Sequence, residues 1–470
     1  MHVSDRSSVS SAAFSMTRYV PYWLDDPNAP AVRPPLVSDE RCDLVIVGAG
    51  FTGLWTALLA KQGEPDLEVV VVEARSVAWG GSGRNGGFCD ASLTHGLSNG
   101  LSRFPEEIGR LEQLGLENLL QIKEAVGALA IDCNFELNGT IDVATKPWQV
   151  GELQEACEAA TSLGHDARLL DRAEIQDVVR SPTYLAGLQV HGRTAMLNPA
   201  HLAWGLAAAC EEHGVRLFEQ TEVHSIDKQG SQLLLRTAHG TITAERAVMA
   251  TNASRPLLRR VRPYILPVYD YVLVTEPLSP DQMAAIGWRG REGLGDAGNQ
   301  FHYYRRTADD RILFGGYDAI YHFGNGIGDA LERRPATFAK LFGHLLETFP
   351  GLEGVAITHA WGGAIDTCSR FCAFYGTAFA GRAAYAAGFT GLGVGASRFA
   401  AQVMLELIGE RGELASLKMV RTKPLPFPPE PLRFLVVEAT RRSLARADEA
   451  EGRRNPWLRL LDRLGLGFDS

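Results

Sequence analysis

The chain of 470 residues is too long for one small hydrophobic core, so two or three domains are expected. Its content of 46% hydrophobic and 21% charged residues is ordinary for a globular enzyme, and the net charge of −9 argues against a general nucleic-acid binder. No stretch approaches the ~20 consecutive apolar residues that a membrane-spanning helix needs, so no integral membrane segment is expected.

The first fifteen residues are rich in Ser and lack the charged and apolar regions of a signal peptide. We expect them to be disordered within an N-terminal arm over residues 1–40, with Met16 as an alternative start. The seven Cys residues, an odd number without regular spacing, predict a reducing compartment, and the cytoplasm is the expected location. Cys368 and Cys372 have no partner pair and few nearby His, so no metal site is expected.

A strand followed by a glycine-rich turn opens the folded part of the chain. Residues 42–47 (CDLVIV) are apolar and rich in β-branched side chains, which predicts a buried parallel strand. The pattern G-x-G-x-x-G follows at once. Gly48 permits a tight turn, Gly50 lets the backbone approach a pyrophosphate, and Gly53 lets a helix pack against the strand. Phe51 and Thr52 complete the turn, whose N–H groups would face the phosphates.

The next elements complete a dinucleotide-binding unit. Residues 54–62 predict a helix, and residues 67–72 (LEVVVV) predict a second strand that ends at Glu73. Glu73 lies 20 positions beyond Gly53 (73 − 53), where an acidic side chain accepts hydrogen bonds from the adenosine ribose. This pattern predicts a Rossmann-type βαβ unit but does not distinguish FAD from NAD.

The segment after Glu73 favours FAD. Ala74 and Arg75 lead into a glycine-rich stretch at residues 79–87, which could also be a flexible linker. Its intact S-G-R-N-G-G string at residues 82–87 resembles the D-amino-acid oxidase-like superfamily of flavoproteins, and within it the γ-glutamylputrescine oxidase-like group. The resemblance implies that this loop runs along the FAD pyrophosphate and the isoalloxazine edge. The residues concerned are Ser82, Gly83, Arg84, Asn85, Gly86 and Gly87.

Three later segments extend the resemblance to roughly residues 40–410. A helix opened by Asn198 and a strand at residues 215–218 lead to Val223, whose backbone the resemblance places beside adenine. A strand at residues 246–250 runs into a turn on the cofactor. The loop at residues 388–395 opens a helix whose first N–H groups would face flavin O2 and N1, although it could be an ordinary glycine-rich cap. The cofactor residues implied by the last two segments are Ala250, Thr251, Gly388, Gly391, Leu392, Gly393 and Val394.

The predicted fold class is α/β with an α+β second domain. A Rossmann-type FAD-binding domain is interleaved with an antiparallel-sheet substrate domain. The FAD-binding domain is expected over residues 41–145, 188–255 and 355–410, the substrate domain over 146–187 and 256–354, and a C-terminal extension over 411–470.

The expected substrate domain contains a strand at residues 265–275 and a hairpin built from residues 301–306 and 311–316. In the resembling family such a sheet forms a roof over the flavin. Alternation places Phe301, Tyr303 and Arg305 on one face and His302, Tyr304 and Arg306 on the other, but does not say which face meets the flavin. The substrate-pocket candidates are Tyr303, Arg305, His302 and Trp361. For the aromatic residues, core packing is the alternative to a substrate role, and for Arg305 a solvated position is the alternative to a carboxylate clamp.

Two further segments bear on the substrate side. Residues 361–365 (WGGAI) resemble a family segment near the flavin, but the following T-P-D-x-x-P of many members is replaced by residues 368–373 (CSRFCA). In the C-terminal extension, residues 432–447 show an apolar stripe made of Leu432, Leu435, Val436, Ala439 and Leu444. We expect a helix docked on the chain's own body, with subunit contact in a homo-oligomer or binding at a membrane surface as alternatives.

The resemblance implies a flavoenzyme that oxidises the C–N bond of a small amine or amino acid by hydride transfer to flavin N5, giving an imine that hydrolyses. The FAD is expected to be non-covalent, because no Cys lies near residues 361–363, where sarcosine oxidase-like relatives attach it. Oxidation of a 2-hydroxyacid or another C–OH group, and a non-catalytic flavoprotein, remain alternatives. No Lys lies between Lys228 and Lys340, which favours slow reaction with oxygen, although Arg305, Arg306 or His302 could replace it.

Overall fold

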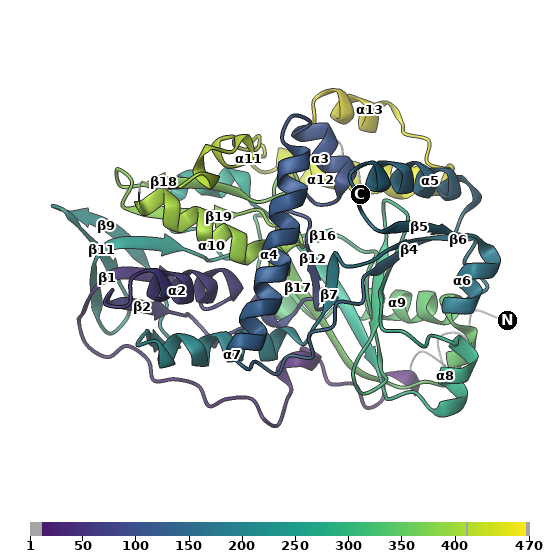
Figure 1. Ribbon diagram of the computed structural model, residues 1–470, viewed down its shortest axis with the longest axis horizontal. Coiled ribbons are helices and arrows are strands. Elements are labelled where there is room, and N and C mark those ends of the chain that lie inside the picture. Colours follow the sequence, from purple (N-terminus) through teal and green to yellow (C-terminus); the bar gives the residue numbers. More distant parts are fainter. Residues whose placement is uncertain (1–11, 410–411, 467–470) are drawn as a thin grey trace.

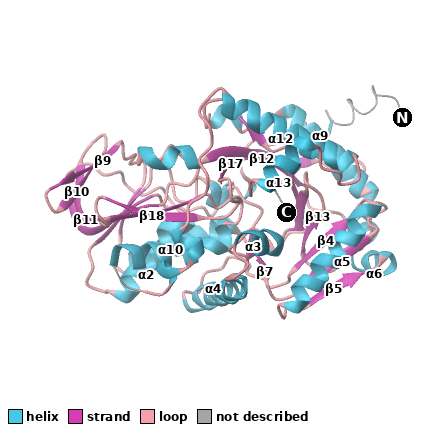
Figure 2. Ribbon diagram, turned by 90° about the horizontal axis from the view of Figure 1, so that it is seen from above, coloured by secondary structure: helices cyan, strands magenta, loops and turns pink. Residues whose placement is uncertain are grey.

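The computed structural model describes residues 12–409 and 412–466, which form two large sheets in opposite halves of the molecule (Figures 1 and 2). Helix α4 (Ile108–Ala128) runs across the middle of Figure 1, between the two halves. The predicted combination of a mixed α/β sheet domain with a second, largely antiparallel sheet is confirmed.

The first sheet has a parallel centre, because β1 pairs in parallel with both β2 and β11, and β11 pairs in parallel with β19. Its path is β18 (Phe374–Ala378), β19 (Ala383–Ala387), β11 (Thr241–Met249), β1 (Glu40–Val47), β2 (Val69–Val72) and β8 (Arg216–Phe218), with β10 (Gln232–Arg236) and β9 (Ser225–Gln229) extending β11. The strands expected at residues 42–47, 67–72, 215–218 and 246–250 are β1, β2, β8 and the end of β11.

The helices packed on this sheet follow the predicted order. Helix α2 (Phe51–Gly63) starts directly after β1, α7 (Pro199–Glu212) precedes β8, and α10 (Gly393–Gly409) follows β19. Gly53 is required where α2 meets β1, because a Cβ there would lie 1.9 Å from the carbonyl oxygen of Gly48. Asn198 caps α7 as expected, since its side chain accepts hydrogen bonds from the backbone N–H groups of Ala200 and His201.

The second sheet contains the predicted hairpin and forms the other half of the molecule. Its path is β16 (Ile320–Tyr321), β12 (Leu266–Thr275), β15 (Ile312–Gly316), β14 (His302–Arg306), β13 (Gly293–Asp296), β4 (Thr140–Ala144), β6 (Ala186–Val190) and β5 (Ala167–Leu170), with β17 (Ile357–Thr367) paired to β12. Strands β4 and β17 fall in ranges that the sequence assigned to the FAD-binding domain. The backbone hydrogen bonds of both strands belong to the second sheet.

Smaller elements connect or flank the two halves. They are η1 (Tyr22–Leu24), η2 (Gly81–Gly83), β3 (Phe88–Asp90), α3 (Leu97–Arg103), α5 (Pro147–Ser162), α6 (Arg172–Val178), β7 (Thr194–Met196), η3 (Arg259–Tyr264), α8 (Pro280–Ile286), η4 (Asp329–Leu331), α9 (Pro335–Thr348), η5 (Pro350–Leu352), η6 (Leu414–Ser416) and α11 (Lys418–Arg421).

The N-terminal arm is packed where it is described. The ring of Phe14 lies 5.6 Å from that of Phe342, and the N–H of Arg18 donates to the carbonyl of Thr358 at 2.8 Å. The predicted disorder of the first fifteen residues is therefore wrong for the described part of that segment, and residues 1–11 lie outside the described residues.

The C-terminal extension contains α12 (Leu432–Glu449) and α13 (Pro456–Arg463), which pack against each other; α13 lies at the upper edge of Figure 1 and α12 below it. The predicted helix exists, but only part of its predicted apolar stripe is packed: Leu444 contacts the buried cluster of Ala447, Leu458 and Leu461. Leu432 is 53% exposed and Leu435 61% exposed, whereas Ser443 and Ala447 are buried. Tertiary contacts of the whole extension decide which face of α12 packs on the body. The sequence periodicity of the helix alone does not predict those contacts.

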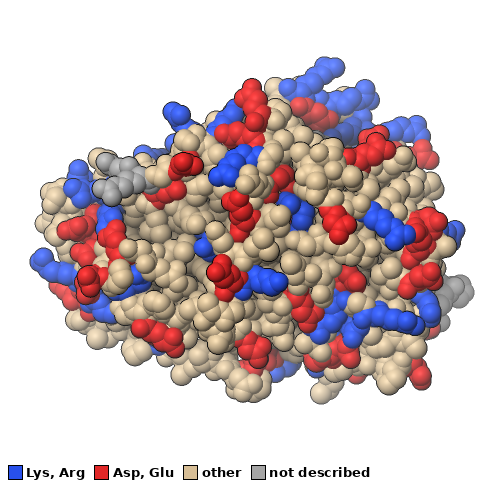
Figure 3. All heavy atoms as spheres, viewed as in Figure 1, with Lys and Arg blue, Asp and Glu red and all other residues tan. Residues whose placement is uncertain are grey.

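The surface carries mixed charge. In Figure 3, acidic and basic side chains are interspersed over most of the visible face, and basic side chains gather at its upper right edge. Among the described residues, no helix combines the length and the apolar character that crossing a bilayer would require. All seven cysteines lie in the described residues, and none of them is in a disulfide.

Candidate functional site

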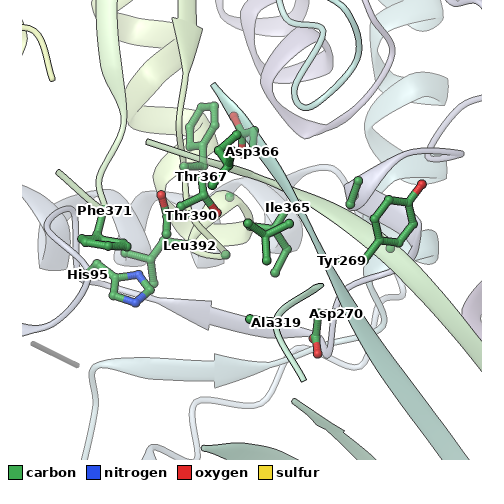
Figure 4. A pocket seen from close by; sticks show the side chains of 18 of the residues that line it. His95, Tyr269, Asp270, Ala319, Ile365, Asp366, Thr367, Phe371, Thr390 and Leu392 are labelled. Atoms are coloured by element: carbon green, nitrogen blue, oxygen red, sulfur yellow. The ribbon is translucent and has the colours of Figure 1, made fainter. Parts of the chain in front are cut away.

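A cavity of about 810 Å³ lies between the two sheets and takes its walls from both. Loops after strands of the first sheet contribute Gly50, Asn252 and Leu392, and the second sheet contributes Asp270 and Tyr303. Figure 4 shows Asp270 on the opposite side of the cavity from His95 and Phe371. A volume of this size is typical of cofactor and ligand pockets.

The parallel strands explain why loops that are distant in sequence meet here. Val47 is in register with Val72 and Met249, and Met249 is in register with Tyr385, so β1, β2, β11 and β19 end along one edge of the sheet. Ligands of open α/β sheets bind outside this carboxyl edge.

The glycine-rich turn after β1 is held against the loop at residues 79–87. Ser82 Oγ accepts a hydrogen bond of 2.9 Å from the N–H of Phe51, the first residue of α2. A Cβ on Gly50 would lie 2.8 Å from the same Oγ. The side chain of Asn85 folds the loop on itself, because it donates to the carbonyl of Gly81 at 2.8 Å and accepts from the N–H of Gly87 at 2.8 Å.

Glu73 lies beside the same turn, as its spacing predicts. Its carboxylate accepts hydrogen bonds of 2.9 Å from the N–H groups of Ala49 and Arg75. Burial raises the pKa of Glu73, and these two backbone hydrogen bonds oppose the rise. The N–H of Thr221 donates to the carbonyl of Glu73 at 2.7 Å, which brings the segment leading to Val223 alongside.

We call the part of the cavity between the glycine-rich turn after β1 and the loop at residues 79–87 the cradle. Two polar atoms of the cavity wall favour a polar ligand there. Three bonds fix Arg84: Nε donates to the carbonyl of Trp79 at 2.7 Å, and Nη1 donates to Glu332 Oε2 at 2.6 Å and to the carbonyl of Gly362 at 3.3 Å. Its Nη2 is buried without a hydrogen-bond partner in the described residues, as is Oδ1 of Asn252. Because unpaired buried polar atoms are costly, these two atoms fit a bound group with its own donors and acceptors, as a dinucleotide has.

The loop that opens α10 is held by a buried carboxylate. Asp366, at 2% exposure, accepts a hydrogen bond of 2.6 Å from the N–H of Gly388, and the N–H of Thr390 donates to its carbonyl at 3.2 Å. Burial raises the pKa of Asp366 to about 7 although backbone hydrogen bonds lower it. Asp366 therefore fixes the backbone in front of the α10 N-terminus, where helix N–H groups favour negative charge.

The roof of the cavity carries a carboxylate paired with a phenol. The hydroxyl of Tyr303 on β14 donates to Asp270 Oδ2 on β12 at 2.5 Å, and the N–H of Tyr271 donates to Oδ1 at 2.7 Å. Strand β15 lies between them, and a Cβ on its Gly315 would lie 2.7 Å from the Tyr303 ring. Because Gly315 has no side chain, the ring of Tyr303 can pass over β15 and reach Asp270. Burial raises the pKa of Asp270 to about 6.

Of the four substrate-pocket candidates, only Tyr303 lines the cavity. His302 lies on the opposite face of β14, with Nδ1 paired to Asp296 and Nε2 2.8 Å from His344 Nδ1. The hairpin face that meets the cavity is thus that of Phe301 and Tyr303, which alternation alone did not identify.

Arg305 and Trp361 lie outside the cavity wall. Arg305 is 2% exposed and donates to the carbonyls of Gly87 and Leu197 at 3.1 and 2.8 Å, so the predicted solvated position is wrong. Trp361 is buried and donates from Nε1 to the carbonyl of Arg84 at 2.9 Å. Both side chains stabilise the loop at residues 79–87 from outside the cavity.

The predicted cofactor residues divide into two groups. Those that line the cavity are Gly50, Phe51, Thr52, Ser82, Arg84, Asn85, Gly86, Ala250, Gly391, Leu392, Gly393 and Val394. Those beside it in sequence but outside its wall are Gly48, Gly53, Glu73, Ala74, Arg75, Gly83, Gly87, Val223, Thr251 and Gly388. The wall residues that sequence reasoning missed include Asp270, Asp366, His95 and Phe371. None of these four belongs to a motif. For Asp270, the available signal was the presence of a carboxylate within a predicted apolar strand.

Comparisons with known proteins agree with this geometry. The family model described as FAD dependent oxidoreductase (DAO) matches residues 43–407. The γ-glutamylputrescine oxidoreductase of Escherichia coli K12 is 31% identical over 424 residues, covering 87% of this chain and 92% of that protein. The probable oxidoreductase OrdL of Haemophilus influenzae is 28% identical over 400 residues, covering 82% and 87%. The crystal structure of glycine oxidase from Geobacillus kaustophilus superposes with a TM-score of 0.68 at 22% identity, covering 82% of this chain and 99% of that one.

Proposed function

Since the chain belongs to the DAO family of FAD dependent oxidoreductases, we infer that it oxidises the C–N bond of an amine or amino acid, with FAD as the hydride acceptor. The observation that carries the choice of an amine is the pair of Asp270 and Tyr303 in the cavity roof. A carboxylate in a partly dry site attracts a cationic substrate group such as an ammonium.

We propose that the cradle holds FAD through the residues that meet at the carboxyl edge of the first sheet. The turn at Gly50 and Ser82, with the unpaired atoms of Arg84 and Asn252, would hold the pyrophosphate side, and Glu73 the adenosine ribose. The backbone at the start of α10 would stabilise negative charge on the flavin. The attachment is non-covalent in this proposal. The thiol of Cys368 is buried, its pKa is raised to about 12 by burial, and it donates to the carbonyl of Cys372 at 3.1 Å.

When FAD is bound, it supplies the acceptor for the hydride that leaves the carbon bearing the nitrogen. The chain's own part is to present a neutral amine in a fixed position. Asp270, ionised above about pH 6, takes a proton from the substrate ammonium, and Tyr303 holds the carboxylate in place. The cavity wall then keeps bulk water away from the amine until the imine product leaves and is hydrolysed to a carbonyl compound and ammonia or amine.

The alternative of 2-hydroxyacid oxidation is less well supported. A 2-hydroxyacid lacks the ammonium group that Asp270 would attract, and it brings only a carboxylate. The alternative of a non-catalytic flavoprotein is also less well supported, because such a protein would not need a cavity that joins the cradle to a buried carboxylate.

The experiment is anaerobic mixing of the yellow protein with a panel of amines, amino acids and 2-hydroxyacids, followed by flavin absorbance. Bleaching by an amine or amino acid supports the proposal. Bleaching by 2-hydroxyacids alone would move the function to C–OH oxidation, and no bleaching by any class would favour the non-catalytic alternative.

We also propose the cytoplasm as the location, because seven unpaired thiols suit a reducing compartment.

A further inference from the structure

The cavity continues past the roof and beneath the C-terminal extension. Its wall there comes from α12, α13 and residues 425–428, which precede them in the chain. The residues that carry the argument are Val436, Val437, Leu444, Leu458 and Leu461, all apolar. We call this part of the cavity the outer chamber. The family match ends at residue 407, so the chamber is built by helices outside the matched region.

Charged side chains that reach the outer chamber are paired within the extension. Arg441 Nη2 lies 3.1 Å from Glu438 Oε2, and Arg454 Nη1 lies 3.3 Å from Asp462 Oδ1. Asp462 Oδ1 is also buried without a hydrogen-bond partner in the described residues, so it could accept a hydrogen bond from a neutral donor on the ligand. A charge on the ligand would lose hydration and would have to compete with ion pairs that are already formed. The chamber therefore fits an uncharged group.

The extension is fixed to the body, so the chamber is a permanent part of the fold. Asp448 on α12 accepts hydrogen bonds from the N–H groups of Asn299 and Gln300 at 3.1 and 2.9 Å, directly before β14. At the start of the helix, Arg433 Nη1 donates to Asn325 Oδ1 at 2.7 Å. These bonds tie α12 to the same sheet that carries Tyr303.

We propose that the substrate is an amine whose nitrogen lies at Asp270 and whose remainder is an uncharged apolar chain or ring that fills the outer chamber. This inference rests on the proposed amine oxidation and names its substrate class. It predicts discrimination against small polar amines, such as glycine and sarcosine, and against amines with a second charge at the far end.

The test is the chain-length dependence of anaerobic flavin reduction in the FAD-loaded enzyme. For linear primary amines from butyl to octyl, the ratio of reduction rate constant to Kd is expected to rise roughly fourfold per added methylene. An α,ω-diamine of the same length should be at least ~100-fold poorer, because its second ammonium would lose its hydration and would have to compete with Arg454 for Asp462. A flat series, or equal use of diamines and monoamines, would overturn the inference.

A pair of variants on α12 tests the location of the apolar group. Leu444→Ala, in the chamber wall, should reduce the preference for octylamine over butylamine roughly tenfold. Leu435→Ala, on the exposed face of the same helix, is the matched control and should leave that preference unchanged. Equal behaviour of the two variants would place the apolar group elsewhere and overturn the assignment.

A binding measurement separates this inference from the proposed function. Amines in which the carbon bearing nitrogen has no hydrogen cannot be oxidised, but they can be titrated by calorimetry. If no amine bleaches the flavin, the proposed function fails. Tighter binding of the longer of these amines would still support an apolar chamber. A Kd that does not depend on chain length would overturn the inference.

Discussion

The hydroxyl of Tyr303 lies 2.5 Å from Oδ2 of Asp270 and reaches it across Gly315 on the strand between them. This contact joins two strands of the second sheet at the point where the sheet faces the dinucleotide cradle. It places an ionisable oxygen in the cavity and fixes its orientation.

Replacing the carboxylate should remove most of the amine-oxidising activity. Asp270→Asn is expected to lower the limiting rate of flavin reduction roughly 100-fold or more, since general-base groups contribute about 100- to 10,000-fold. Because burial raises the pKa of Asp270 to about 6, the native rate should fall as the pH drops below that value, when the carboxylate is protonated. Stopped-flow pH profiles check both points. Tyr303→Phe, which keeps the carboxylate, should lose less activity than Asp270→Asn. An acidic limb that persists in Asp270→Asn would contradict the assigned role.

The glycine-rich turn gives a prediction about cofactor binding. Gly50→Val should yield colourless protein without FAD, because even a Cβ at this position would lie 2.8 Å from Ser82 Oγ and a branched side chain would enter the cradle. Gly63→Ala at the far end of α2 is the control, since its added Cβ has no neighbour within 4 Å. The measurement is the ratio of flavin to protein after purification. Full FAD occupancy in Gly50→Val would show that the cradle is elsewhere.

Asp366 should make stability depend on pH. The folded protein raises its pKa from 3.8 to about 7, mainly through burial, so the protonated form is favoured in the folded state. This contribution is complete below the unfolded pKa and is lost as the pH rises through about 7. Asp366→Asn keeps an acceptor for the N–H of Gly388 and has no charge to bury. Its free energy of unfolding relative to the native protein should rise by about 2 to 3 kcal/mol between about pH 5 and about pH 8. Denaturant unfolding at both pH values measures this, and no change would contradict the buried charge.

Reoxidation by oxygen should be slow. The cavity wall within residues 12–409 and 412–466 contains no lysine, and Lys340 Nζ is bound to Asp318 Oδ1 at 2.8 Å. Arg305, one of the residues that could have replaced a lysine, is occupied by two backbone carbonyls. Arg84 does line the cavity, but it is paired with Glu332 Oε2 at 2.6 Å, and its proposed place is the pyrophosphate side. Without a lysine ammonium at the flavin, superoxide formation is less stabilised. Stopped-flow mixing of the reduced enzyme with oxygen is the measurement. A dye should act as the better electron acceptor. Reoxidation by oxygen as fast as turnover would contradict the prediction.

The cradle could be predicted from the sequence because its parts are local. The strand, the three glycines, the helix and Glu73 have fixed spacing, and each has a backbone reason for its residue type. The same holds for Asn198, whose cap needs only the next three residues.

The roof could not be predicted in the same way. Alternation placed Tyr303 and Arg305 on one face of a strand, but the N-terminal arm and the loop near Gly87 cover Arg305, and no local pattern shows this. The partner of Tyr303 lies 33 positions earlier, on a strand that is not adjacent in the sheet. For α12, Leu444 faces the buried cluster while Leu435 is exposed, so the apolar stripe of the helix marks its packed face only in part.

The most direct test of amine oxidation is an anaerobic single turnover in which flavin bleaching and product are measured together. With an amine substrate, we expect one carbonyl compound and one ammonia or amine for each FAD reduced. Bleaching without a carbonyl product, or with a hydroxyacid as the only reductant, would contradict the account.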